Sequence, residues 1–349
     1  MQMMESRLAL SRRGVHVLAV LATLATFILI ASGGLVTSHG VGMSVPDWPT
    51  TFGYNMFLFP VSRWVGGVFY EHSHRLIASA VGMITVVLTV WLLIAEPRKW
   101  VKVLGMAALV AVILQGVLGG LRVTLIKDEL GIFHGMLAQS FFVLLGIISV
   151  ATSRDFLRGA WAPAMHAQRL CSWMLVLTML VFLQLGIAAT MRHQHAGLSI
   201  PDFPAAYGRL LPDTSPLAIE EINKQRTLEG EVPATAVQIW MQMAHRFMAL
   251  VIFVCVALFA WRVLREVEVG GYVRVWSVIL LAMVLVQAGL GAWTIWSNKA
   301  ADVATAHMAL GALMLFVCGR LTFRLYVSNH NEGLRCEAAA DVRTAASVA

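Results

Sequence analysis

Eight long apolar stretches constrain this chain more than any other feature. A helix needs about 20 mostly apolar residues to cross a bilayer, and each stretch is of that length. They lie near residues 15–35, 75–95, 102–122, 132–152, 171–191, 246–264, 274–294 and 305–325. Only 13% of the residues are charged, against roughly a quarter in soluble domains. The sequence therefore predicts an all-α polytopic membrane protein with eight transmembrane helices.

The distribution of positive charge predicts how the helices are oriented. Most of the 26 lysine and arginine residues lie in the N-terminal tail, in the segments near residues 98, 158 and 265, and in the C-terminal tail. Positive residues favour the cytoplasmic side, so both termini are predicted to be cytoplasmic. The net charge of +7 suits anionic membrane lipids and does not indicate nucleic acid binding.

The sequence gives little sign of other modules. Cys171, Cys255, Cys318 and Cys336 lie in helices or in the C-terminal tail and show no CxxC spacing, so no disulfide framework is expected. Residues 327–349 have few large apolar side chains and are predicted to be a disordered tail. No GxGxxG motif follows a strand, so electrons for any redox reaction must come from a partner or from quinol.

Four sequence blocks recur in the same order, which indicates duplication. Asp47 in "SVPDWP" pairs with Asp202 in "SIPDFP", and His74 in "SHRLIASAVG" pairs with His245 in "AHRFMALVIF". The block "VILQGVLGG" pairs with "VLVQAGLGA", and "FHGMLAQ" with "AHMALGA". The spacing between paired residues widens within "LPDTSPLAIEEINKQRTLEGEVPA", which predicts an insertion outside the membrane in the second half.

The duplication divides the chain into two halves of four helices, residues 1–153 and 154–326. Because four is an even number, both halves enter the membrane in the same direction. They should form two four-helix bundles related by a pseudo-twofold axis along the membrane normal.

Four histidines repeat within this scheme. His74, His134, His245 and His307 each lie near the start of an even-numbered span, and the predicted orientation places all four near the outer face. Ionisable groups inside membrane spans are costly and usually functional. Two histidines from parallel helices of one bundle can reach a common point, as cofactor ligands do in helix bundles.

Two ligands per half suit haem better than other metal groups. Zinc normally takes three or four protein ligands, and copper needs further donors or a thiolate. Haem iron needs only two axial ligands, so the sequence predicts one bis-histidine haem site in each half. Small residues that could allow a macrocycle or another helix to approach closely are Gly116, Gly119, Gly120, Gly289 and Gly291.

An arginine directly follows the first histidine of each pair. Arg75 and Arg246 each follow a predicted ligand and could bind haem propionates or lipid headgroups. The remaining histidines, His16, His39, His72, His166, His193, His195 and His330, receive no assignment.

The two halves differ three residues before the first histidine. Glu71 precedes His74 on the same helix face, whereas Gln242 precedes His245. One half therefore has a possible general acid or base where the other has a neutral amide. This difference suggests that the first half performs chemistry and the second holds an electron-transfer haem, although Glu71 could also be a simple helix-terminal carboxylate.

The motifs "GLVTSHGVGMSVPDWP", "EHSHR", "FHGMLAQ", "AHR" and "TAHMALG" together resemble the haem A synthases of the CtaA/Cox15 family. The resemblance runs from about Ser32 to Cys318. It implies an oxidoreductase of the bacterial plasma membrane that oxidises a methyl group of haem O to a formyl group, giving haem A for terminal oxidase assembly. Some members have a cysteine pair in the outer loops, which this chain lacks, so it looks like the cysteine-lacking branch.

The resemblance also implies roles for individual residues. His74 and His134 would bind the substrate haem, His245 and His307 would bind a cofactor haem b, and Glu71 would be an essential acidic residue. The partners implied are haem O, the haem O synthase, an unidentified electron donor and membrane lipids, and a homo-oligomer is left open. Two other functions stay open: a dihaem cytochrome that relays electrons to or from quinol, and a haem transport or assembly protein.

Overall fold

The computed structural model describes residues 2–127, 129–157, 167–266 and 269–329. Within these ranges, eight helices are long and apolar enough to cross a membrane. They are α1 (Gln2–Ser38), α2 (Gly67–Ala95), α3 (Lys99–Leu125), α4 (Glu129–Ala151), α6 (Ala167–His193), α8 (Ala236–Arg265), α9 (Gly271–Trp296) and α10 (Ala301–Asn329). The prediction of an all-α protein with eight membrane-spanning helices is confirmed.

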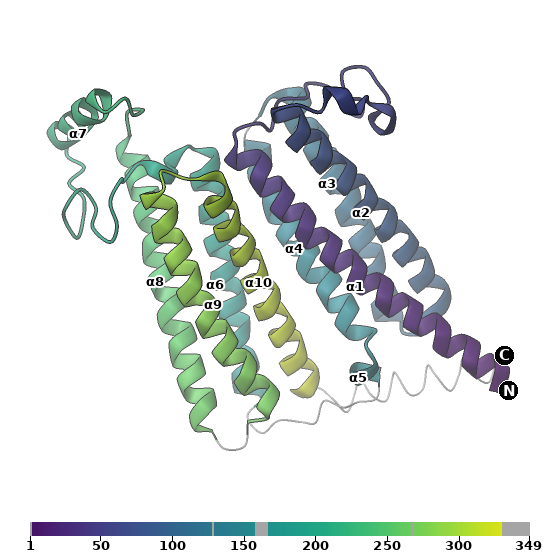
Figure 1. Ribbon diagram of the computed structural model, residues 1–349. Coiled ribbons are helices and arrows are strands. Elements are labelled where there is room, and N and C mark those ends of the chain that lie inside the picture. Colours follow the sequence, from purple (N-terminus) through teal and green to yellow (C-terminus); the bar gives the residue numbers. More distant parts are fainter. Residues whose placement is uncertain (1, 128, 158–166, 267–268, 330–349) are drawn as a thin grey trace.

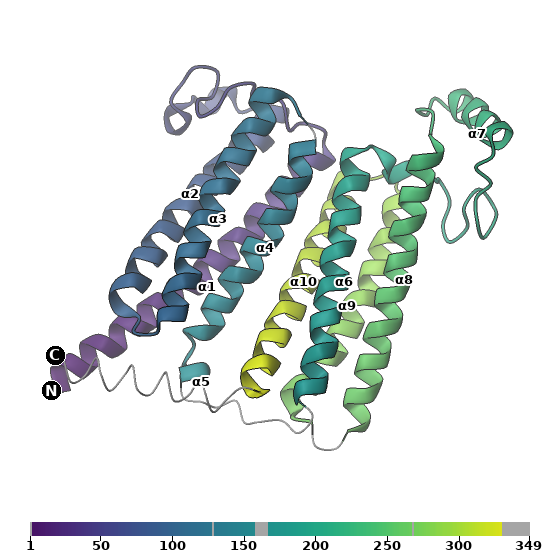
Figure 2. The ribbon, with the colours of Figure 1, turned by 180° about the vertical axis from the view of Figure 1, so that it is seen from behind.

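The spans form two groups of four that stand side by side, α1–α4 and α6 with α8–α10 (Figures 1 and 2). Each group has its own buried apolar cluster. Leu88 and Leu145 lie in the first cluster, and Phe259 and Leu321 in the second. The pseudo-twofold axis between the halves stays a prediction.

Glycines allow the two halves to approach closely. A Cβ added at Gly34 of α1 would lie 2.3 Å from the Met308 side chain of α10, and one at Gly146 of α4 would lie 2.2 Å from the ring of Phe316. Phe316 also stacks on Phe142 of α4 at 4.8 Å between ring centroids. Helices α1 and α4 of the first half therefore pack on α10 through small residues, as is common in membranes.

The long loops of both halves lie at one end of the molecule, which we call the loop end (Figure 1). The first loop contains two 3₁₀ turns, η1 (Met56–Leu58) and η2 (Val61–Arg63). The second contains a 3₁₀ turn, η3 (Ala196–Leu198), and the helix α7 (Pro216–Leu228). Helix α7 lies in the predicted insertion and is not among the eight candidate spans.

The opposite end carries the short helix α5 (Arg154–Leu157) and the ends of the spans (Figure 2). Helix α10 continues to Asn329, beyond the predicted start of the tail at residue 327. The rest of the predicted tail, with His330 and Cys336, lies outside the described residues, as does His166. Cys171, Cys255 and Cys318 are free thiols.

Candidate functional site

All four repeated histidines lie toward the loop end. His74, His134, His245 and His307 belong to α2, α4, α8 and α10 respectively, and each of these helices starts at that end (Figure 1). Each histidine lies within the first three helical turns. The even-numbered spans thus bring the two members of each pair to a similar depth.

The two rings of the second-half pair lie next to each other. The ring centroids of His245 and His307 are 6.3 Å apart, with 64° between the ring planes. Imidazoles that bind one metal ion, each at about 2 Å, have ring centres roughly 6 Å apart. The Nδ1 atoms of both rings are buried and have no hydrogen-bond partner among the described residues.

The first-half pair has a polar neighbour. His74 and His134 lie near each other. Ser32 of α1 lies 3.2 Å from Nδ1 of His74, whereas Nδ1 of His134 is buried without a hydrogen-bond partner. In the second half, the amide nitrogen of Gln184 on α6 lies 3.4 Å from Nε2 of His245.

Glutamine amides hold the helical backbone at three of the four histidines. Gln115 of α3 donates to the carbonyl of His134 at 3.0 Å, and Gln287 of α9 donates to that of His307 at 2.9 Å. Gln184 donates to the carbonyl of His245 at 3.0 Å. The repeat identifies Gln115 and Gln287 as equivalent positions, and each makes the same contact with a histidine carbonyl in its own half.

Three glycines face the imidazole rings. An added Cβ would lie 3.0 Å from Cε1 of His74 at Gly33, 3.4 Å from Cε1 of His134 at Gly119, and 3.1 Å from Cε1 of His307 at Gly291. A larger residue would push on the ring at these distances. Two of the glycines singled out from the sequence, Gly119 and Gly291, therefore lie directly against histidine rings, while Gly116 and Gly289 have open space at the Cβ position.

The donor set fits haem. Among the described residues, no three His, Cys, Asp or Glu side chains lie together as a metal site would require. A pair of neutral imidazoles without further donors suits an iron whose other four ligands come from a porphyrin. The buried Nδ1 atoms of His134, His245 and His307 have no partner among the described residues, as is common for polar atoms at a site that a bound group completes.

The repeated loops have the same backbone structure. Asp47 accepts hydrogen bonds from the amides of Phe52 and Gly53, and Asp202 accepts them from Tyr207 and Gly208. Gly53 and Gly208 have φ values of 78° and 72°, in the left-handed region that favours glycine. Both loops are therefore built by the same aspartate-centred turn, which supports an architectural role for the P-D-[WF]-P motif.

The charge of Asp47 is stabilised by this turn. Burial alone would raise the pKa of Asp47, but the hydrogen bonds from Gly53, Thr50 and Phe52 outweigh it and lower the pKa below its ordinary value of 3.8.

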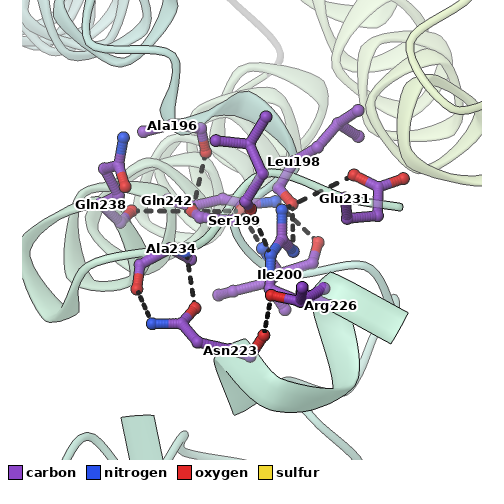
Figure 3. Close-up of polar contacts among 12 residues, drawn as sticks. Ala196, Leu198, Ser199, Ile200, Asn223, Arg226, Glu231, Ala234, Gln238 and Gln242 are labelled. Carbon is purple, nitrogen blue, oxygen red and sulfur yellow. Dashed lines mark hydrogen bonds and ion pairs between the residues drawn. The ribbon is translucent and has the colours of Figure 1, made fainter. Parts of the chain in front are cut away.

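Glu71 and Gln242 occupy equivalent places and hold equivalent loops. Glu71 is 4% exposed, and its Oε2 accepts the amide of Val45 at 2.9 Å. Gln242 is 3% exposed, and its Oε1 accepts the amide of Ile200 at 2.7 Å. The nitrogen of Gln242 also donates to the Ile200 carbonyl at 3.3 Å (Figure 3). Both side chains therefore fasten the loop to the helix that carries the first histidine.

The arginines that follow the histidines also bind the loops. Arg75 donates to the carbonyls of Val45, Asp47 and Thr50 and forms a 2.8 Å ion pair with Glu71. Arg246 donates to the carbonyls of Asp202 and Ala205 in the second loop. These contacts are with backbone, so the proposal that either arginine binds a propionate stays a prediction.

The insertion adds polar contacts to the second loop only. Arg226 of α7 donates to the carbonyls of Leu198 and Val232, and Asn223 exchanges two hydrogen bonds with Ala234 (Figure 3). The hydroxyl of Ser199, next to Leu198, donates to Oε1 of the Gln242 side chain at 3.0 Å. Helix α7 thereby supports the loop that Gln242 holds.

The unassigned histidines lie in varied surroundings. His72 is fully buried against Phe59 and Trp64, with Thr51 3.2 Å from its Nδ1. His39 stacks on Tyr70. His193 lies against Gly131 of α4, His16 contacts the Ser149 carbonyl and the Thr152 hydroxyl, and His195 is the residue before η3.

Comparison with known proteins identifies the family. The family model described as "Cytochrome oxidase assembly protein", COX15-CtaA, matches residues 59–318. The chain belongs to this family. The match includes both members of each histidine pair.

Similar proteins cover nearly the whole chain. A protein named "Heme A synthase" from Lysinibacillus sphaericus is 26% identical over 325 residues, 91% of this chain and 97% of its own length. Proteins of the same name from Geobacillus kaustophilus and Nitrosomonas eutropha are 26% and 24% identical, over 85% of this chain in each case and over 86% and 90% of their own lengths. This COX15-CtaA family member therefore spans most of the length of each of these relatives.

Proposed function

We propose that this protein is an oxidoreductase that converts a methyl group of haem O to a formyl group, yielding haem A for terminal oxidase assembly. The observation that carries the proposal is the pair of partly buried histidines in each half of a COX15-CtaA family member. Relatives of almost the same length carry the name "Heme A synthase". One histidine pair in each half suits a reaction in which one haem is the substrate and another haem is a cofactor.

The two histidine pairs would have separate tasks. His74 and His134 bind haem O as substrate, and His245 and His307 bind haem b. When bound, haem b supplies one-electron transfer for the oxidation. The protein positions both groups through the glutamine contacts to the histidine backbone and the glycines that face the rings.

Glu71 would handle protons during the oxidation. Each oxidation step adds oxygen from dioxygen or water to the methyl carbon and transfers protons together with electrons exchanged with a partner, and a buried carboxylate one turn before His74 can accept or donate those protons. Its Oε1 also forms an ion pair with Arg75 at 2.8 Å, which fixes the position of the carboxylate. Gln242, which binds its loop in the same way, cannot accept a proton.

We infer the placement of the sites from the charge distribution. The loop end faces the outside of the bacterial plasma membrane, and both termini are cytoplasmic. The haem O synthase would supply the substrate, and electrons would be exchanged with a separate donor, because the described chain is composed almost wholly of spans and their loops.

One observation favours an electron-relay cytochrome as the second candidate. Glu71 and Gln242 fasten their loops alike, so Glu71 has a structural task that does not require catalysis. In a relay, both sites would hold haem b and no haem would be changed.

Analysis of the bound haems separates these functions. The protein is produced in a host that supplies haem O, and its haems are extracted, separated by chromatography and identified by mass. Haem A or a hydroxylated precursor beside haem B supports the proposed oxidation. Two haem B groups per chain, with haem O available, would instead support the relay, and unchanged haem O would support a transport or assembly role.

A further inference from the structure

Three basic side chains gather at the loop end, where the two halves meet. Arg122 lies in the last turn of α3, Arg192 near the end of α6, and Lys299 in the turn between α9 and α10. The charge of Arg192 interacts with the charges of both other residues. We call these three residues the basic cluster.

Arg192 extends from the second half to the first. Its Nη2 donates to the carbonyl of Gly34, at 3.2 Å, and to the hydroxyl of Ser38, both on α1. Ser38 in turn lies 3.1 Å from the hydroxyl of Thr305 on α10. The Nε atom of Arg192 is buried and has no hydrogen-bond partner among the described residues. The guanidinium is thus fixed in place and still has a donor available.

Two residues of the basic cluster, Arg192 and Lys299, form no ion pair with a described acidic side chain. Burial and the charge of Arg192 lower the pKa of Lys299. Buried charges are normally paired because desolvation is costly. A bound anion would compensate both cations.

The cluster lies beside the first histidine pair. Arg122 lies close enough to His74 and His134 for its charge to act on both rings. The carbonyl of Gly34 accepts a hydrogen bond from Arg192. The preceding residue, Gly33, lies against the His74 ring, since a Cβ added there would be 3.0 Å from it. The second half has no equivalent of Arg122, because Thr294 occupies that position in the repeat.

We propose that the basic cluster, with Arg192 as its central member, binds the propionate carboxylates of the haem held by His74 and His134. Guanidinium groups pair strongly with carboxylates, and a porphyrin carries two propionates on one edge. The second half would then help to position the substrate of the first half. The inference rests on the proposed haem site, but not on turnover at that site.

Porphyrin esters provide a direct test. The full chain is purified from a host that makes no haem O, and the first-half site is titrated with ferric protohaem and with its dimethyl ester by absorption difference. The wild type should bind the diacid more tightly than the ester. Arg192→Gln should weaken diacid binding about tenfold or more and leave ester binding nearly unchanged.

Matched variants control for charge and folding. Arg209→Gln removes an exposed loop arginine and should change neither affinity, while Arg192→Lys should restore part of the preference for the diacid. Lys299→Gln should produce a smaller loss of the same kind and serves as the second test if Arg192→Gln folds poorly.

Two results would overturn the inference in different ways. If Arg192→Gln and Lys299→Gln keep the full preference for the diacid, the propionate site is wrong and the haem site stands. If His74→Ala leaves the titration of both porphyrins unchanged, the haem site itself is wrong. Added phosphatidylglycerol that stabilises the wild type but not Arg192→Gln, with no change in porphyrin preference, would assign the cluster to a lipid phosphate.

Discussion

The two halves hold their loops with the same hydrogen bond but differ in one charge. Glu71 accepts the Val45 amide, and Gln242 accepts the Ile200 amide, at almost the same distance. Only Glu71 forms an ion pair, with Arg75. The second half shows that an amide satisfies the architecture, so the carboxylate of Glu71 is not needed to build the loop. That surplus charge is the strongest structural reason to place chemistry in the first half.

Replacing one histidine of a pair should have the largest effect, because it should change which haem the protein retains. His134→Ala should abolish haem A formation and remove the substrate haem, because a single axial ligand remains, while haem B stays bound. His307→Ala should remove haem B. Quantifying each extracted haem per chain checks both expectations.

The two variants are each other's control. If His134→Ala and His307→Ala lose the same haem, the halves do not have separate sites. If neither changes the haem content, the histidine pairs are not ligands.

Exchange of the acid for an amide should have the next largest effect. Glu71→Gln should keep the Val45 hydrogen bond, and its amide nitrogen can donate to the Val45 carbonyl as Gln242 does to that of Ile200. The fold and both haem sites should persist, while the rate of haem A formation falls about 100-fold or more. Single-turnover conversion of haem O, together with thermal unfolding in detergent, measures both quantities.

A methyl group beside the imidazole should produce a smaller effect. Gly291→Ala would place its Cβ 3.1 Å from the His307 ring, and Gly119→Ala would place it 3.4 Å from the His134 ring. The ring at His307 must move more, so haem B retention should fall several-fold in Gly291→Ala, and substrate haem retention should fall less in Gly119→Ala. Equal losses in both variants, or a larger loss in Gly119→Ala, would contradict this order. Gly289→Ala, which meets open space, is the control.

The smallest effect is expected at the aspartate turn. The lowered pKa of Asp47 means that its charge stabilises the fold above the ordinary value of 3.8, and that this contribution is lost as the pH falls below it. Asp47→Asn should lower the free energy of unfolding by about 1 kcal/mol at neutral pH and reduce the loss of stability on acidification. Thermal unfolding from neutral pH to about pH 3 measures both. A variant as acid-sensitive as the wild type would contradict the role assigned to this charge.

The spans and the histidine pairs could be predicted from sequence because both depend on local pattern and internal repetition. Apolar length gives the spans, and the repeat aligns His74 with His245. Hydropathy places the start of the second span near residue 75, yet α2 begins at Gly67, because a helix continues through polar residues at the membrane boundary. Glu71 therefore lies inside the helix.

The contacts between distant residues could not be predicted in this way. Arg75 follows a histidine, which suggests a propionate ligand, but its guanidinium meets three carbonyls of a loop about 25 to 30 positions earlier in the chain. Arg192 has no repeated partner, and its place at the boundary between the halves depends on where the end of α6 lies relative to α1. No local pattern encodes such packing, so both roles required the structure.

The most direct test of a division of labour between the halves compares Glu71→Gln with Gln242→Glu. Both variants and the wild type are produced in one host that supplies haem O, and the haems bound to each protein are extracted and separated. The account predicts haem A beside haem B in the wild type and in Gln242→Glu, and unconverted haem O beside haem B in Glu71→Gln. Normal haem A in Glu71→Gln would contradict the account, because the two halves would then not differ in their chemistry through this carboxylate.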